Sequence, residues 1–284
     1  MLLSLVIAQP ASAAPAFRAL VFTKTAGYRH DSIPAGLAMF REQAAANNFE
    51  LVHSEDSSVF TAANLATFDV LIMFQTSGMV WTTESQRQAV EGYLAKWQGH
   101  RLDPQRHGHG HRERVPVVGT RPSTAAHTCG ALPGVLAGTA VVADKKHPST
   151  AAAGTAGTAS EEWYNFDRNP RGDVHVLVTA ERADVQPGPP RHGPDHPISW
   201  CRNTGGGRVW ATAMGHASAA YRETPFRNHV LGGVDVGGRK ESGDCGGTVW
   251  SNFEKRTLDD NTADPMALAV APDGRCSTSS GAGS

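Results

Sequence analysis

DVLIMF, at residues 69–74, is the stretch that decides the fold class. It is a continuous apolar run, which is typical of a parallel strand covered on both faces. RALVFT, at residues 18–23, is a second such run, and residues 32–47 follow it with apolar side chains at helical spacing. The alternation of buried strand and amphipathic helix predicts an α/β domain with a mainly parallel, doubly wound sheet.

Other segments extend this alternation. Residues 83–97 are predicted to form a second helix, with Val90, Tyr93 and Trp97 on one side. Ligands of such sheets bind at the carboxyl ends of strands, so a site is expected in the loops after Phe22, Phe74 and Met214. Further strands are predicted at residues 50–54, 139–143, 174–179 and 208–214.

Composition narrows the function classes. The 284 residues carry 26 Lys and Arg against 27 Asp and Glu, for a net charge of −1. This balance lacks the basic footprint of a general nucleic-acid binder. No apolar run reaches the roughly 18–20 residues that span a bilayer. Neither nucleic acid nor a membrane is therefore an expected partner.

The first residues and the cysteines point to secretion. Residues 1–14, MLLSLVIAQPASAA, place a small-x-small signature after a short apolar run, like the remnant of a signal peptide without its basic start. Four cysteines fit an oxidising compartment, and no CxxC pair suggests a structural zinc site. We predict a disulfide between Cys201 and Cys245, with a buried free Cys201 and an unpaired Cys245 as the alternative.

Five segments occur in this order along the chain: TKTAGYRHDSIPAG (23–36), EEWYNF (161–166), RGDVHVL (171–177), DHPISWC (195–201) and TAMGH (212–216). Together they resemble the ThuA-like (trehalose utilisation) family. The resemblance covers residues 17–237, apart from one gap, and implies the fold of class I glutamine amidotransferases, a flavodoxin-like α/β/α sandwich. It also implies a role in carbohydrate catabolism. The family generally lacks the amidotransferase cysteine, so no catalytic cysteine is expected.

The gap, at residues 98–138, is interpreted as a displaced reading frame. The family pattern expects a strand, a loop like GIHSATD and an FPWW segment there, whereas this chain is rich in His, Arg, Gly and Pro. Codons for residues 109–118, read one base later, can encode MGIESEFPWW, and residues 103–109 can read IHSATDM. We therefore expect the middle strand to be lost and residues 98–138 to pack poorly. The HxHxH pattern of His107, His109 and His111 is set aside as a by-product, so no metal is expected.

Residues 238–284 are interpreted as a linker and the truncated start of a second domain. Residues 244–274 resemble the opening of a quinoprotein glucose/sorbosone dehydrogenase-type β-propeller. Residues 275–281, shifted in frame, can read VFYIER, which would continue that strand. The resemblance implies a larger secreted parent in which a propeller lies downstream and is a partner of the first domain.

Four polar residues are the candidate catalytic groups: His30, Glu162, Tyr164 and His216. Glu162 and Tyr164 lie two positions apart, so an extended chain points both the same way and suits proton transfer at a sugar carbon or hydroxyl. A capping or core pair is the alternative. The neighbouring Glu161 is expected to face solvent. The topology predicts that His30 and His216 face a common cleft with Glu162 or Tyr164 beside them.

Six more residues are candidates for substrate binding. Lys24 and Arg29 could pair with substrate oxygens, and Asp195 could orient an imidazole. Trp200 could stack on a sugar ring, although buried tryptophans more often belong to a core. No GxSxG elbow is present that would mark a serine nucleophile. No GxGxxG loop follows the first strand, so a dinucleotide site is unsupported and no cofactor is expected. The six are Lys24, Arg29, Thr76, Asp195, His196 and Trp200.

The sequence leaves three functions open. The first is a secreted domain that acts on a sugar or oxidised sugar by acid/base chemistry. The second is a non-catalytic sugar-binding module of a larger secreted sugar dehydrogenase. The third is an inactive product of the frame displacement. Convergence of the four candidate catalytic residues in space would favour the first function.

Overall fold

The computed structural model divides the chain into two compact units, residues 1–248 and 249–284. The described residues of the second unit form two antiparallel strands, β12 (Pro265–Val270) and β13 (Cys276–Ser280). The structure describes residues 14–95, 118–119, 128–131, 135–151, 156–166, 169–181, 195–204, 207–237, 243–246, 265–270 and 276–280.

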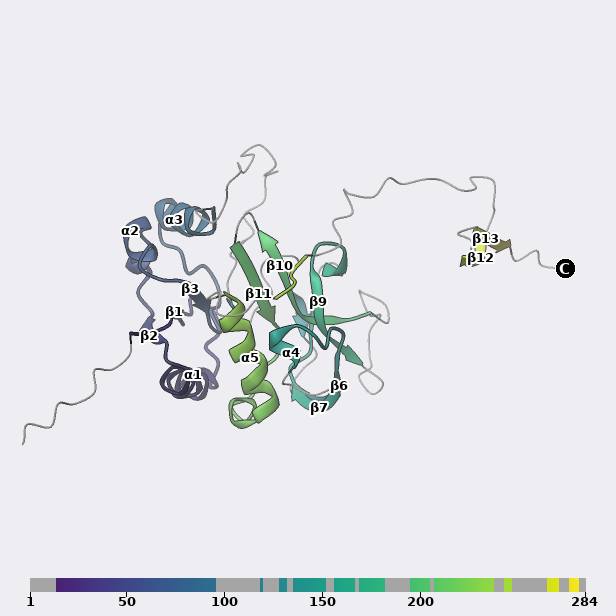
Figure 1. Ribbon diagram of the computed structural model, residues 1–284, viewed down its shortest axis with the longest axis horizontal. Coiled ribbons are helices and arrows are strands. Elements are labelled where there is room, and N and C mark those ends of the chain that lie inside the picture. Colours follow the sequence, from purple (N-terminus) through teal and green to yellow (C-terminus); the bar gives the residue numbers. More distant parts are fainter. Residues whose placement is uncertain are drawn as a thin grey trace, which may run out of the picture. The chain divides into compact units, whose positions relative to one another are not determined.

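A nine-stranded mixed sheet forms the centre of the first unit (Figure 1). Its strand order is β2-β1-β3-β4-β11-β10-β9-β6-β7. The pairs from β2 to β11 are parallel, and those from β11 to β7 are antiparallel. The bounds are β1 Arg18–Phe22, β2 Glu50–Ser54, β3 Val70–Met73, β4 Val118–Gly119, β6 Leu136–Val142, β7 Ala156–Glu161, β9 His175–Glu181, β10 Pro197–Thr204 and β11 Gly207–Thr212.

The prediction of a mainly parallel sheet is therefore wrong, because four of the eight strand pairs are antiparallel. The physical reason is the length of the connections. Only two residues separate β10 from β11, and a parallel pair would need a crossover of a dozen or more. The fold is mixed α/β.

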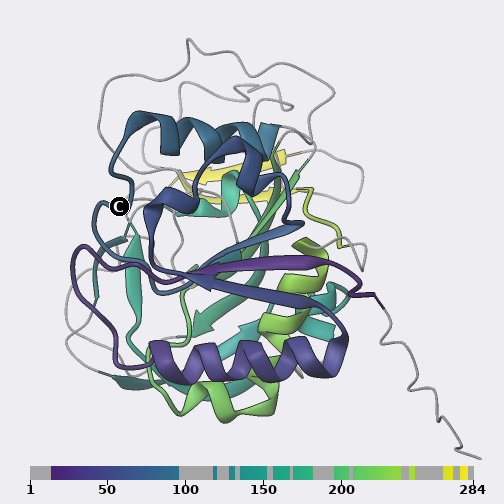
Figure 2. The ribbon, with the colours of Figure 1, turned by 90° about the vertical axis from the view of Figure 1, so that its left-hand side faces the viewer.

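Helices cover both faces of the parallel half (Figure 2). α1 (Ile33–Asn47) and α5 (Thr224–Gly237) lie on one face, and α2 (Ala62–Leu65) and α3 (Glu84–Ala95) lie on the other. A short helix, α4 (Pro148–Ala151), contacts α5. None of the described helices is long and apolar enough to cross a membrane.

Part of the hydrophobic core lies between α1 and β3. Phe74 follows β3 and is fully buried, and its ring packs edge-on against Phe40 and Tyr221. Gly36 of α1 allows this approach, because a Cβ at that position would lie 2.1 Å from the Phe74 ring. The apolar run that predicted β3 is thus covered on both faces, as expected.

The expectation that residues 98–138 contribute no central strand is wrong for Val118–Gly119, which forms β4 between β3 and β11. Backbone pairing explains this, since the edges of β3 and β11 present N–H and C=O groups that any segment can satisfy. β5 (Thr128–Ala131) pairs with β8 (Tyr164–Phe166), and β6 begins at Leu136. The HxHxH segment, residues 107–111, lies outside the described residues, as does the loop expected after Trp97.

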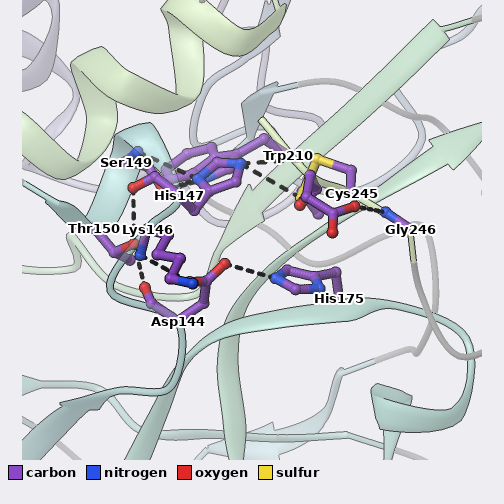
Figure 3. A network of polar contacts seen from close by, with 11 residues as sticks. Asp144, Lys146, His147, Ser149, Thr150, His175, Trp210, Cys245 and Gly246 are labelled. Atoms are coloured by element: carbon purple, nitrogen blue, oxygen red, sulfur yellow. Dashed lines mark hydrogen bonds and ion pairs between the residues drawn. A yellow bond between two sulfur atoms is a disulfide. The ribbon is translucent and has the colours of Figure 1, made fainter. Parts of the chain in front are cut away.

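The predicted disulfide between Cys201 and Cys245 is confirmed, with a Cα–Cα distance of 5.2 Å. Cys201 lies on β10, and the bond fastens residues 243–246 to this strand. The buried imidazole of His147 lies beside it, with Nε2 3.6 Å from the Cys201 sulfur (Figure 3). Burial lowers the pKa of His147 to about 4, so this imidazole is neutral at pH 7.

Candidate functional site

Two histidines from distant loops meet at the carboxyl edge of the parallel strands. His30 lies between β1 and α1, and His216 follows β11. Their ring centroids are 5.1 Å apart and the rings are nearly perpendicular. The Tyr28 ring packs edge-on against His30 from the other side, 4.9 Å away. The His30 side chain is buried, whereas His216 is a quarter exposed.

The segment between β7 and β8 adds a carboxylate and a phenol to these histidines. Glu162 Oε2 accepts a hydrogen bond from the Tyr164 hydroxyl and lies 2.9 Å from Nδ1 of His216. Three side-chain atoms, a ring nitrogen of His30, a ring nitrogen of His216 and a carboxylate oxygen of Glu162, all lie within 4.8 Å of one another. The structure thus brings the four candidate catalytic residues together, and we call them the His30–Glu162–Tyr164–His216 cluster.

The expectation that Glu161 faces solvent is wrong. Its side chain is buried, and its two carboxylate oxygens accept backbone N–H bonds from Gly215 and His216, both of 2.9 Å. Glu161 is the last residue of β7, and its carboxylate contacts the backbone of the loop that follows β11. Glu161 therefore positions the backbone that carries His216.

The loop before His216 depends on a glycine and an amide. Gly215 has φ +97°, a conformation that L side chains rarely adopt. Its carbonyl accepts hydrogen bonds from Gln75 Nε2 (2.8 Å) and the Tyr221 hydroxyl (2.6 Å). Gln75 directly follows the apolar run of β3, and this position was the available signal for it. The sequence interpretation passed over Gln75 in favour of Thr76.

Three of the proposed substrate-binding residues lie in the loops after β1 and β3. Lys24 Nζ donates to Ser57 Oγ at 2.8 Å, and Arg29 pairs with Glu55 at 2.8 Å. Thr76 is half-buried in the loop after β3. Because Arg29 is largely exposed, its ion pair contributes little to stability and leaves the guanidinium accessible.

The other three candidates support the site indirectly or belong to the core. The Asp195 carboxylate forms a bidentate pair with Arg171, both contacts 2.6 Å, so it does not orient an imidazole through that pair. His196 Nε2 donates to the Tyr164 carbonyl at 2.9 Å and so holds β8. Trp200 is fully buried against Phe166, so stacking of its ring on a sugar is excluded in this conformation.

Burial raises the pKa of Glu161 from 4.5 to about 7, because desolvation disfavours the charged form more than the two backbone N–H bonds favour it. The folded protein therefore keeps a proton that the unfolded chain loses between pH 4.5 and 7. The stabilisation from this group is complete below pH 4.5 and is lost as the pH rises through 7, a change of about 3 kcal/mol.

The Glu161→Gln variant, which does not titrate here, provides the test. We expect the free energy of unfolding of the wild type, relative to this variant, to fall by up to about 3 kcal/mol between pH 4.5 and pH 8. Urea denaturation at a series of pH values measures it. A difference that is independent of pH would show that Glu161 has an ordinary pKa in the folded state.

Comparison with known proteins identifies the family. The family model of ThuA, described as trehalose utilisation, matches residues 18–235. No curated protein sequence matches the chain. A ThuA-like protein from Bacteroides uniformis has a similar structure, with 16% identity and a TM-score of 0.60 over 85% of this chain and 99% of that one. A ThuA-like protein from Parabacteroides merdae also has a similar structure, with 16% identity and a TM-score of 0.55, over 80% of this chain and 91% of that one. The chain therefore belongs to the ThuA family.

Proposed function

We propose that this ThuA domain is secreted and acts on a sugar or an oxidised sugar by acid/base chemistry. The family is associated with trehalose utilisation, which supports a carbohydrate-related role. The observation that carries the finer proposal is the contact of one carboxylate, Glu162, with both the Tyr164 hydroxyl and the His216 imidazole. Three groups able to carry protons are thus in direct contact.

The accessibility of these groups fits a reaction site. The side chains of Glu162 and His216 are 23% and 25% exposed, so a small molecule could reach them. Acid and base groups need to lie within hydrogen-bond distance of the atoms that exchange protons. In the proposed reaction, Glu162 removes a proton from a carbon or hydroxyl of the sugar, and an imidazole of His30 or His216 protonates the oxygen that gains charge.

Supporting residues also have defined parts in this proposal. Glu161 and Gln75 hold the loop that carries His216, and His196 holds the backbone of Tyr164. Arg29 and Lys24, at the carboxyl end of β1, are the cations available to contact sugar oxygens from the rim. No thiol takes part, and Cys201 and Cys245 are joined in the disulfide.

We also propose that the parallel half of the sheet is flavodoxin-like, as in class I glutamine amidotransferases. Its order, β2-β1-β3-β4-β11, corresponds to 2-1-3-4-5 when the parallel strands alone are counted. That is the order of flavodoxin-like sheets, which bind ligands where the order reverses, between the first and third strands. His30 follows the first of these strands.

The test is to incubate the purified chain with trehalose, other disaccharides and their keto derivatives, and to follow substrate and product by NMR. We expect one of these sugars to be converted, and conversion to be lost in His30→Ala and His216→Ala. Asp144→Asn is the matched control, because the His175–Asp144 pair, at 2.8 Å, has the same chemistry and similar exposure away from the site (Figure 3).

Two other outcomes would replace the proposal. Saturable binding of a sugar without conversion would favour a sugar-binding module that serves a downstream propeller. Conversion only by a chain whose residues 98–138 are restored to the family frame would favour an inactive product of frame displacement.

A further inference from the structure

We propose that His30, Glu162 and His216 bind a divalent transition-metal cation, with Zn²⁺ as the expected occupant. The inference rests on the proposed function for its chemical purpose, but the binding itself is measured without a sugar. Two imidazoles and one carboxylate are the protein ligands of several catalytic zinc sites and of non-haem iron sites. The three residues form no local sequence motif, because more than a hundred positions separate His30 from Glu162.

The spacing of the donor atoms supports the proposal. Two ligands bound at about 2.1 Å to one cation lie about 3.0–3.4 Å apart in octahedral or tetrahedral geometry. Glu162 Oε2 and His216 Nδ1 are 2.9 Å apart, which is close to that spacing. All three donor atoms lie within 4.8 Å of one another, so movement of the side chains by about an ångström would complete the set.

The surroundings of the three donors resemble those of metal ligands. Ligating carboxylates and histidines are usually held by further hydrogen bonds. Glu162 accepts a hydrogen bond from the Tyr164 hydroxyl, and the backbone N–H of His216 donates to Glu161. These contacts fix the carboxylate and the chain that carries the imidazole, so little order remains to be imposed by the cation.

One side of the cluster is accessible. His30 is buried, while Glu162 and His216 are about a quarter exposed. Structural zinc sites are closed by four protein ligands, whereas catalytic sites leave a position for water or substrate. With three protein ligands and an accessible side, this site would be of the second kind, and the cation would polarise a sugar oxygen. With a cation bound, Glu162 and the two imidazoles would act as its ligands in place of the proton-transfer roles proposed for them above, and Tyr164, which is not a ligand, would exchange the protons.

The other group of metal-binding residue types in the described part of the chain is His147, Cys201 and Cys245. Its sulfur atoms are joined in a disulfide, so neither is available as a thiolate ligand. All three residues are also buried, which leaves no access for an external ligand. We therefore assign the cation to His30, Glu162 and His216 alone.

In the experiment, a chelator first removes bound metal from the full chain. The chain is then titrated with Zn²⁺, followed by calorimetry, and separately with Co²⁺, followed by visible absorption. The background variant carries His107→Ala, His109→Ala and His111→Ala, because the HxHxH pattern is itself able to bind metal. We expect one equivalent to bind in this background. Glu162→Gln or His216→Ala should weaken binding by about 100-fold or more.

Asp144→Asn is again the matched control and should bind as the background does, because it removes an equivalent His–carboxylate pair elsewhere. Circular dichroism of each variant shows whether it is folded. The proposal is overturned if the background binds no Co²⁺ with ligand-field bands, or if Glu162→Gln, His30→Ala and His216→Ala all bind like the background while folded.

Sugar conversion, measured with and without the chelator, separates this inference from the proposed function. Site-dependent cation binding without conversion of any sugar would leave the metal site standing and reject the acid/base function. If the stripped chain still converts a sugar and no cation binds at His30, Glu162 and His216, the metal site is rejected and the acid/base function stands.

Discussion

Turnover of the sugar substrate is expected to fall by about 100-fold or more in Glu162→Gln, because general acid–base catalysis contributes 10²–10⁴-fold in rate. Glutamine has nearly the same shape and still accepts a hydrogen bond from Tyr164, so the fold should be kept. It cannot take a proton, and it is a poorer metal ligand than a carboxylate. The loss should therefore appear in kcat rather than in stability.

Steady-state kinetics and urea denaturation of the same preparations measure both quantities. Tyr164→Phe removes the hydroxyl that contacts Glu162 and provides a second variant with little change in volume. We expect it to lower kcat as well. A Glu162→Gln variant that keeps its full kcat would show that this carboxylate neither transfers a proton nor holds a catalytic cation.

Removal of the Cys201–Cys245 disulfide is expected to destabilise the first unit by about 4 kcal/mol in the chain-entropy description of a cross-link. The bond spans 44 residues, so its loss frees a long loop in the unfolded chain. Cys245→Ala leaves the Cys201 sulfur buried beside the neutral His147 imidazole. Urea denaturation at pH 7 measures the change.

Cys276→Ala, in β13 of the second unit, controls for loss of a cysteine elsewhere. It should leave the unfolding of the first unit unchanged. A destabilisation by Cys245→Ala of less than about 1 kcal/mol would show that the disulfide does not restrict the unfolded chain as the chain-entropy description requires.

The parallel half of the sheet could be predicted because its apolar runs have one dominant explanation. Residues 50–54 were predicted as a strand and form β2 with the same bounds. The helix predicted at residues 32–47 begins at Ile33 and ends at Asn47. Burial on both faces and helical periodicity are local properties, and both can be read from short windows of sequence.

The helix α5 was missed for a physical reason. It contains Gly232 and Gly233, which lower helix propensity. A Cβ at Gly233 would lie 2.4 Å from the Trp210 ring, and one at Gly232 would lie 2.5 Å from Ser149. Tertiary packing requires these glycines, and nothing in the local sequence shows the partner. β10 was missed because Pro197, Arg202 and Asn203 interrupt its apolar pattern.

The convergence of His30, Glu162, Tyr164 and His216 followed from topology, since loops at the carboxyl ends of strands meet at one edge of the sheet. The role of Glu161 could not be predicted. Its partners, the backbone N–H groups of Gly215 and His216, lie 54 and 55 positions further along the chain, so no local pattern shows that this loop covers the carboxylate. The packing of Trp200 against Phe166 and the pairing of Asp195 with Arg171 could not be predicted for the same reason, because these partners lie elsewhere in the chain.

We propose that Glu162 and His216 act as parts of one site. A double-mutant cycle on kcat/KM with Glu162→Gln, His216→Ala and the double variant tests it most directly. We predict that the double variant is no more than about threefold worse than the worse single variant, because loss of either residue disables the same unit. If the two single losses in kcat/KM multiply in the double variant, Glu162 and His216 act independently and do not form one site.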